Sequence, residues 1–227
     1  MSGTSDLERV EHVPGQRFLE DNLEMTLRDF LPLMQARIVE RTTYIGIQTL
    51  KNPLDFWSYQ ELIWTVRPDV IVEVGNFRGG TLLAFAHIFD ALGKGRVIGV
   101  DIDQTEIGET VRSHPRITLI EGDAVEQSSA VRQKISPEDR MLMIEDSSHT
   151  FENTLNVLRK YSDLVPRGSY FIVEDGICRH GIDVGPSPGP YEAATEFVRE
   201  NSDFVIDRTC ESFFLTWNPR GYLRRIG

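Results

Sequence analysis

The fold of this chain is decided by the stretch VIVEVGNFRGGT, residues 70–81. Four of its first five residues are apolar, with Glu73 as the exception, which is typical of a buried parallel strand. Glycines at positions 75 and 79 then let the backbone turn sharply and approach a ligand with no Cβ in the way. A helix is expected over residues 80–92, so the stretch predicts one strand–turn–helix unit.

The same alternation of strand and helix continues along the chain. Further strands are expected at residues 96–101, 117–121, 141–146 and 170–175. Strands that are apolar on both faces and alternate with helices, the clearest of which covers residues 150–164, predict a parallel sheet covered by helices. Two β segments, 204–207 and 213–217, have no clear helix between them. We therefore expect an α/β fold with one doubly wound, Rossmann-like sheet, mostly parallel with an antiparallel C-terminal edge hairpin.

The N-terminal part of the chain has a different character. Residues 1–16 are expected to be poorly ordered, and residues 17–52 to form a helical segment ahead of the main domain at 53–227. Apolar positions between residues 17 and 39 follow helical spacing that Pro32 interrupts, which predicts one broken helix or two short ones. We interpret this segment as covering the core or a second subunit, so a homo-oligomer is expected; a substrate lid is the alternative.

Composition and charge exclude several classes of protein. Apolar residues make up 40% of the chain and charged residues 26%, which is ordinary globular composition. The net charge of −11 disfavours nucleic acid and anionic membranes as partners. No apolar run approaches the roughly 18–20 residues that span a bilayer, and the N-terminus has no secretory pattern. With Cys178 and Cys210 as the only cysteines, we expect reduced thiols and a cytoplasmic protein.

In a doubly wound sheet the ligand binds beyond the carboxyl ends of the strands, and acidic residues lie there. Asp101 lies 26 residues after Gly75, a placement that suits both hydroxyls of a ribose and indicates an adenosine ligand. Glu73 is expected to meet a cationic or hydroxyl group of that ligand. Asp123, after the third strand, is interpreted either as a contact to the adenine amino group or as a helix N-cap.

The fourth and fifth strands end in the strongest pattern. Adjacent parallel strands lie roughly 5 Å apart, so Asp146 should face Glu174 and Asp175. Three carboxylates so close repel one another, and either one is protonated or a cation neutralises them. Oxygen ligands favour Mg²⁺, with Mn²⁺ or Ca²⁺ as alternatives; helix caps on a solvated acidic rim are the other interpretation. His149, three residues past Asp146, is the nearest proton acceptor unless it is only a packed or capping residue.

These motifs resemble class I S-adenosylmethionine-dependent methyltransferases, and more narrowly the metal-dependent O-methyltransferases of the catechol and caffeoyl-CoA type. In those enzymes an aspartate after strand four and an Asp-Asn pair after strand five bind Mg²⁺, and a lysine three residues past the first aspartate is the base. The matching positions here hold Asp146, Glu174 with Asp175, and His149. The pair is thus Glu-Asp, and histidine replaces the lysine.

The closest resemblance is to the cephalosporin hydroxylase/rhamnosyl O-methyltransferase family, over about residues 43–227. It is carried by PLDFWSYQELI at 53–63, GRVIGVD at 95–101 and NPRGYLRR at 218–225. A 2-His-1-carboxylate iron site needs a His-x-Asp/Glu motif. No histidine in the chain has Asp or Glu at the second following position, so methyl transfer is expected rather than oxygenation.

The resemblance implies an S-adenosylmethionine-dependent, metal-assisted O-methyltransferase acting on a hydroxyl of a small molecule, a sugar or natural-product intermediate. It implies that Asp146, Glu174 and Asp175 hold the metal and that His149, or Asp146 itself, takes the proton. The residues expected to bind the methyl donor are Glu73, Gly75, Asn76, Phe77, Gly79, Gly80, Thr81, Asp101 and Asp123.

Two features of the sequence leave alternatives open. The loop over residues 178–191, with Arg179, His180 and Asp183, either recognises the acceptor or is a mobile surface crossover. The rival functions are a non-catalytic adenosyl-binding subunit of a biosynthetic complex and an NAD-dependent oxidoreductase. The missing Gly-x-Gly-x-x-Gly motif counts against the oxidoreductase.

Overall fold

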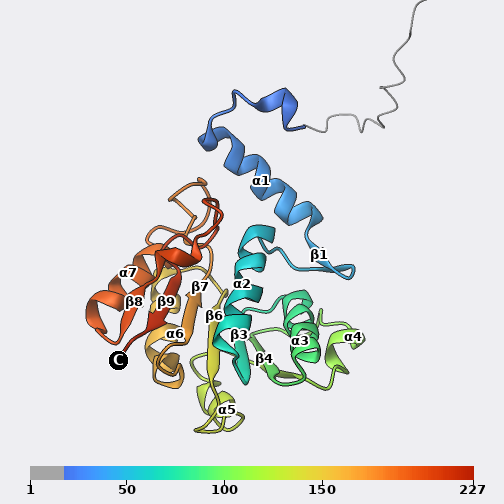
Figure 1. The fold of residues 1–227 in the computed structure, drawn as a ribbon, viewed down its shortest axis with the longest axis vertical. Coiled ribbons are helices and arrows are strands. Elements are labelled where there is room, and N and C mark those ends of the chain that lie inside the picture. The colour runs from blue at the N-terminus through green and yellow to red at the C-terminus, as the bar shows by residue number, and fades with distance from the viewer. Residues whose placement is uncertain (1–17) are drawn as a thin grey trace, which may run out of the picture.

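A seven-stranded sheet forms the centre of the molecule in the computed structural model, which describes residues 18–227 (Figure 1). Its strands are β3 (Val70–Val74), β4 (Arg96–Asp101), β5 (Ile117–Glu121), β6 (Met141–Glu145), β7 (Tyr170–Val173), β8 (Phe204–Ile206) and β9 (Tyr222–Arg225). They lie in the order β5-β4-β3-β6-β7-β9-β8. The first five strands in this order are parallel, and β9 is antiparallel to both β7 and β8. The mostly parallel α/β sheet with an antiparallel C-terminal edge is confirmed.

Helices cover both faces of the sheet (Figure 1). They are α2 (Pro53–Val66), α3 (Gly80–Leu92), α4 (Glu109–Arg112), α5 (Ser128–Arg132), α6 (Phe151–Tyr161) and α7 (Pro190–Glu200). On β3, Val72 packs into the apolar cluster with α6 and α7, whereas Ile71 packs into the cluster with α2 and α3. Successive residues of a strand point to opposite faces, so a strand between two helical layers must be apolar on both.

The strand ends differ from the predictions at two functional positions. The helix at 80–92 and the strands at 70–74, 96–101 and 117–121 have the predicted bounds. β6 ends one residue early and β7 two residues early, so Asp146 and the pair Glu174–Asp175 lie in the loops that follow.

One strand of the C-terminal hairpin was predicted in the wrong place. Residues 213–217 form a loop, and the strand that pairs with β7 and β8 is β9. The loop is fixed by a side chain instead of a strand partner: the Asp55 carboxylate accepts hydrogen bonds from the Thr216 hydroxyl (2.5 Å) and the Trp217 N–H (2.7 Å).

The N-terminal segment contains one helix, α1 (Leu27–Arg41), and a small hairpin of β1 (Thr43–Tyr44) and β2 (Ile47–Gln48). A short 3-10 turn precedes α1 at Glu20–Asn22. The predicted break at Pro32 is wrong, because α1 runs through it while packing Leu31 and Ile38 against Ile177, Ile182 and Trp217. This packing offsets the one helical hydrogen bond that proline cannot make.

Figure 1 shows α1 beyond one end of the sheet, so this helix covers neither face of the sheet core. The prediction for residues 1–16 falls outside the described residues, and the homo-oligomer stays a prediction. Across residues 18–227 the longest helices are too short or too polar to cross a membrane.

Candidate active site

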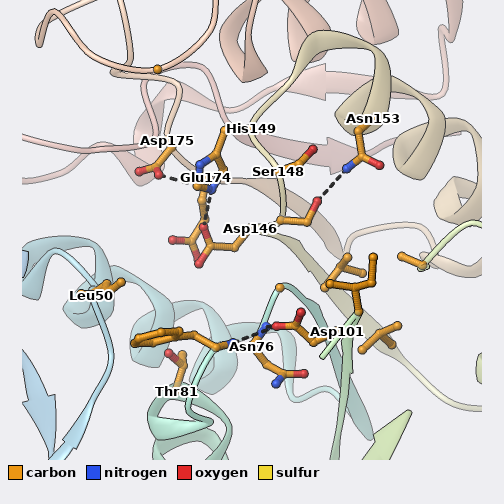
Figure 2. A pocket seen from close by; sticks show the side chains of 18 of the residues that line it. Leu50, Asn76, Thr81, Asp101, Asp146, Ser148, His149, Asn153, Glu174 and Asp175 are labelled. Carbon is orange, nitrogen blue, oxygen red and sulfur yellow. Dashed lines mark hydrogen bonds and ion pairs between the residues drawn. The ribbon is translucent and has the colours of Figure 1, made fainter. Parts of the chain in front are cut away.

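A cavity of about 660 Å³ opens at the carboxyl ends of the parallel strands (Figure 2). The predicted site residues that line it are Gly75, Asn76, Phe77, Thr81, Asp101, Asp123, Asp146, His149, Glu174 and Asp175. Gln35 and Val39 of α1 complete the wall. The cavity lies where strand-end reasoning predicted it, and the N-terminal segment helps to enclose it.

Several lining residues have strained backbones. Leu50, Phe77, His149 and Asp175 all line the cavity and have φ between 47° and 57°. This left-handed region is unfavourable for residues with a Cβ, and such residues concentrate at binding sites. Among the described residues, four of the nine non-glycine residues with positive φ line this cavity, which favours a functional site independently of its charge.

Gly75 makes the close packing of two strand ends possible. Its φ is +81°, and a Cβ at this position would collide with the backbone carbonyl of Asp146. Only glycine lets the turn after β3 lie against the turn after β6. The two turns therefore share one cavity.

The carboxylates after β4 and β5 are held by the backbone. Asp101 Oδ2 accepts hydrogen bonds from the N–H groups of Asn76 (2.9 Å) and Phe77 (3.0 Å), which fixes the turn after β3. Asp123 Oδ1 accepts from the N–H groups of Val125 (2.8 Å) and Glu126 (3.1 Å) while the residue also lines the cavity. Asp123 therefore caps a turn, and the interpretation of it as a helix N-cap is wrong, because Gln127 is the N-cap of α5. The contact to the adenine stays a prediction.

Three residues predicted to bind the donor are absent from the cavity wall: Glu73, Gly79 and Gly80. Glu73 is fully buried, because strand alternation turns its side chain toward the face that α2 and α3 cover. Gly79 is the N-cap of α3, with a φ of 76°. A Cβ on Gly80 would collide with Thr49, so this glycine lets the β1–β2 hairpin pack on α3.

The acidic residues after β6 and β7 form two groups that share Asp146. One group joins Asp146 to His149 and Asp175, and the other joins Asp146 to Glu73 and Glu174. His149 Nε2 lies 3.1 Å from Asp146 Oδ1 and 3.4 Å from Asp175 Oδ2 (Figure 2). Glu174 and Asp175 are neighbours in sequence, yet they belong to different groups.

Sequence reasoning missed Lys51, which lies within the acidic cluster. Its buried Nζ lies 2.5 Å from Asp146 Oδ2, 2.5 Å from Glu174 Oε1 and 3.2 Å from Glu73 Oε1. Burial lowers the pKa of Lys51, but the three carboxylates outweigh it and hold that pKa well above its ordinary value. The lysine is therefore charged, and it neutralises part of the acidic cluster.

The charges on the cavity side are paired as well. Burial lowers the pKa of His149, but Asp146 and Asp175 reverse this and raise it to about 9. The pKa of Asp146 is lowered, because Lys51 and His149 outweigh the effect of burial. Asp146 is thus an ionised carboxylate bridged between two cationic side chains.

The C-terminal tail positions the end of β7. Asn218, fully buried, accepts a hydrogen bond from the Asp175 N–H (3.1 Å) and donates one to the Tyr59 hydroxyl (2.6 Å). Asn218 thus ties the strained Asp175 backbone to α2. The NPRGYLRR motif supports the site without lining it.

The loop after β7 reaches the cavity through other residues than those predicted. Cys178, Val184 and Gly185 line the cavity. Arg179 instead pairs with Asp183, and the His180 ring lies 2.6 Å from a carboxylate oxygen of Glu192. The loop therefore offers an apolar wall, and its predicted charged residues form their own ion pairs.

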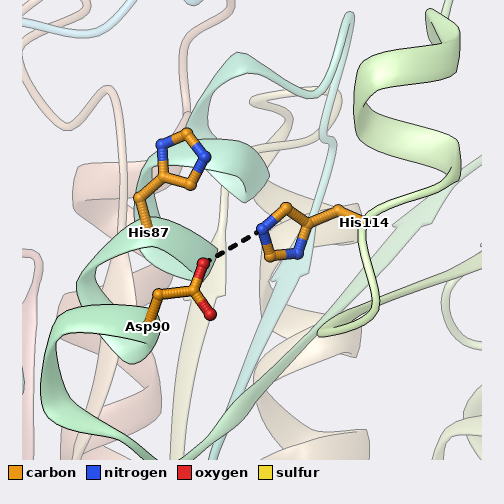
Figure 3. A group of neighbouring side chains, drawn as sticks. All are labelled: His87, Asp90 and His114. Atoms are coloured by element: carbon orange, nitrogen blue, oxygen red, sulfur yellow. Dashed lines mark ion pairs between the residues drawn. The ribbon is translucent and has the colours of Figure 1, made fainter.

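A second histidine-containing group lies away from the cavity (Figure 3). His114 Nε2 is 3.3 Å from Asp90 Oδ2, and His87 Nδ1 is 3.0 Å from the Tyr44 hydroxyl. Arg116 Nε donates to the other Asp90 oxygen at 2.5 Å. Because a guanidinium already neutralises the only carboxylate, this group is an ion-paired network that ties β1 to α3.

Comparisons with known proteins identify the family of this chain. The family model for rhamnosyl O-methyltransferase/CmcI matches residues 36–226. A rhamnosyl O-methyltransferase of Mycobacterium tuberculosis strain H37Rv is 31% identical over 192 residues, covering 82% of this chain and 78% of that protein. Its counterpart in Mycobacterium leprae strain TN is 31% identical over 191 residues, covering 81% and 83%.

Two solved structures match over most of their length. One, described as cmcI-D160 Mg-SAM, has a TM-score of 0.65 and 25% identity and covers 96% of this chain and 88% of its own. The other, described as cmcI-N160 SAH, has a TM-score of 0.63 and 26% identity, with coverage of 82% and 83%.

Proposed function

Because the chain belongs to the rhamnosyl O-methyltransferase/CmcI family and is an S-adenosylmethionine-dependent O-methyltransferase, we propose that it methylates a sugar hydroxyl of a small glycoside with the help of a divalent cation. One observation carries the proposal: the turn that holds Asp101 and the group that holds Asp146, His149 and Asp175 open into a single cavity. A methyl donor and a hydroxyl must meet within one enclosed space for in-line transfer.

The donor fits the end of the cavity next to β4 and β5. Asp101 would bind the ribose hydroxyls through Oδ1, which accepts only a long hydrogen bond (3.5 Å) from the Asp103 N–H. Asp123 would lie near the adenine. Gly75 lets the turn after β3 pack against the turn after β6, which would bring the sulfonium end of the donor close to Asp146. The relatives named for bound S-adenosylmethionine or its demethylated product support this placement.

A divalent cation fits the Asp146–His149–Asp175 group. Two carboxylates within reach of one another and open to the cavity are an oxygen-rich set of the kind that Mg²⁺ prefers. Asp146 and Asp175 would hold the ion, and Glu174 would join them only by giving up its contact with Lys51. When bound, the ion would stabilise negative charge on the acceptor oxygen.

The proton of the acceptor hydroxyl needs a recipient. Such a hydroxyl has a pKa some six units above neutrality, so full deprotonation costs roughly 8 kcal/mol. His149 Nε2 and Asp146 Oδ1 are 3.1 Å apart and face the same part of the cavity. With a pKa of about 9, His149 is protonated in the free site and could accept this proton only after losing its own, which a nearby divalent cation would favour by charge repulsion. Asp146 would then fix the orientation of the neutral ring.

The test is transfer of labelled methyl groups from S-adenosylmethionine to rhamnose-containing glycosides. We expect transfer to a sugar hydroxyl, a loss of at least about tenfold after chelation, and recovery with Mg²⁺. If chelation leaves turnover unchanged, the cation proposal is wrong while the methyltransferase activity stands. Donor binding without transfer to any glycoside would contradict the proposed acceptor class and would point to a hydroxyl on another kind of small molecule.

A further inference from the structure

The acidic cluster contains two cation positions that overlap at Asp146. The outer position, between Asp146, His149 and Asp175, opens into the cavity. The inner position, between Asp146, Glu73 and Glu174, is occupied by the ammonium group of Lys51. Each position draws on a different oxygen of Asp146: Oδ1 faces His149 and Oδ2 faces Lys51.

Lys51 is held in place by the chain on either side of it. Leu50 has a φ of 55°, and Asn52 is the N-cap of α2. The Asn52 side chain also donates to Asp55 at 2.7 Å, and Thr49 packs against Gly80. With 6% of its side chain exposed, Lys51 has little freedom to leave the cluster.

The inner position has the composition of a cation site. Three carboxylates with ligand atoms within 4.8 Å of one another would attract a hard divalent ion. Both carboxylate oxygens of Glu73 are buried, and neither accepts a hydrogen bond from residues 18–227. Among the described residues, the ammonium group of Lys51, 3.2 Å from Oε1, is the one positive charge paired with this carboxylate. Removing the ammonium group would leave the buried Glu73 carboxylate without a neutralising charge.

We propose that Lys51 is a positioning residue that acts as a built-in cation: it fills the inner position, turns Asp146 Oδ1 toward the cavity and confines a divalent ion to the outer position. The inference rests on the proposed function only for the outer ion. The inner position stands on the contacts of Lys51 alone.

The test compares Mn²⁺ binding to the full-length wild type and to Lys51→Met, which keeps an unbranched side chain without the charge. Free Mn²⁺ is measured by electron paramagnetic resonance in the absence of donor. We expect Lys51→Met to bind Mn²⁺ at least about tenfold more tightly, because three carboxylates become available to the ion. Lys51→Arg keeps the charge and should retain the wild-type affinity.

A second substitution locates the new ion. Glu73 belongs only to the inner group, so Glu73→Gln in the Lys51→Met background should abolish the gain in affinity. Lys94→Met is the matched control, because Lys94 forms an exposed pair with Asp69 far from the cluster. It should leave Mn²⁺ affinity unchanged.

Thermal unfolding is the second readout. Lys51→Met should melt at a lower temperature than the wild type without metal and gain more from Mn²⁺ than the wild type does. If the variant folds only with Mn²⁺, recovery of its circular dichroism by Mn²⁺ supports the proposal, and failure of Mn²⁺ to restore the fold overturns it.

Other outcomes separate this inference from the proposed function. Unchanged or weaker Mn²⁺ binding by folded Lys51→Met overturns it, as does a gain that persists in the double variant with Glu73→Gln. A wild type that binds no Mn²⁺ contradicts the outer ion of the proposed function, whereas tighter binding by Lys51→Met in the same experiment still supports the inner position.

Discussion

The two halves of the cavity satisfy their carboxylates in opposite ways. In the donor half, Asp101 and Asp123 accept hydrogen bonds from backbone N–H groups within their own or the adjacent turn. In the acid half, Asp146 is paired with the side chains of Lys51 and His149. Backbone donors are fixed by the fold, whereas side-chain cations can be replaced by another cation.

This difference suggests that the two halves of the cavity have different roles. A carboxylate held by backbone amides keeps a constant shape and suits the binding of a cofactor that is the same in every turnover. A carboxylate shared between side-chain cations responds to the charge of whatever enters the cavity. The comparison predicts that substitutions in the two halves affect different measurable quantities.

The largest effect is expected from Asp146→Asn. The substitution keeps the shape of the side chain but removes the charge that both Lys51 and His149 share. Methyl transfer should fall about a thousandfold, within the range for loss of acid–base function. Donor affinity, measured by calorimetry, should change less than about threefold. An equal loss in donor affinity would contradict the division between the two halves.

A substitution in the donor half should lower donor affinity more than the rate of methyl transfer. Asp101→Asn weakens charge-assisted hydrogen bonds to the turn and to the ribose, so donor affinity should fall about 10–100-fold. The rate of methyl transfer at saturating donor should stay within a few-fold of wild type. Calorimetry and single-turnover rates measure the two quantities, and a collapse of the saturated rate would show that the halves are not separable.

An intermediate effect is expected at Asn218, which holds the backbone of Asp175 in place. Asn218→Ala leaves the Asp175 N–H and the Tyr59 hydroxyl without their partner, which should lower the free energy of unfolding by about 1–3 kcal/mol. Methyl transfer should also fall several-fold at unchanged donor affinity, because Asp175 loses its anchor. Urea denaturation measures the first quantity. Ser212→Ala, at an exposed hydroxyl, is the control and should change stability by less than about 0.5 kcal/mol.

The smallest effect is expected outside both halves. His87→Gln replaces a ring in the network of Tyr44, Asp90 and His114, none of which lines the cavity. Stability should change by less than about 1 kcal/mol, and methyl transfer should stay at the wild-type level. A loss of activity would mean that the β1–β2 hairpin transmits this network to the cavity through residues 49–51.

The fold could be predicted where local pattern alone decides it. β3, β4 and β5 are short apolar runs bounded by turns, and the structure gives them the predicted bounds. The C-terminal edge was harder, because the aromatic residues 213 and 214 suggested a strand although Phe214 is 84% exposed. β9 has two basic residues in four, and its pairing with both β7 and β8 identifies it as a strand.

The residues of the candidate site also fall into those that local sequence pattern predicts and those that it does not. Strand-end reasoning brought Asp101, Asp146 and Asp175 to one cavity, since parallel strands end at the same edge. Lys51 was missed because 95 residues separate it from Asp146, and no local pattern marks a buried lysine. Glu73 could have been placed correctly: strand alternation puts it on the same face as Ile71, beneath the helices.

The position of Lys51 also decides where this chain can be shortened. A fragment begun at Pro53, the start of α2, would retain every strand of the central sheet and all the carboxylates after β6 and β7. It would nevertheless lack the ammonium group that lies between Glu73, Asp146 and Glu174. We therefore expect the smallest active fragment to begin upstream of Pro53, because the segment ahead of α2 supplies the cation that lies among these buried carboxylates.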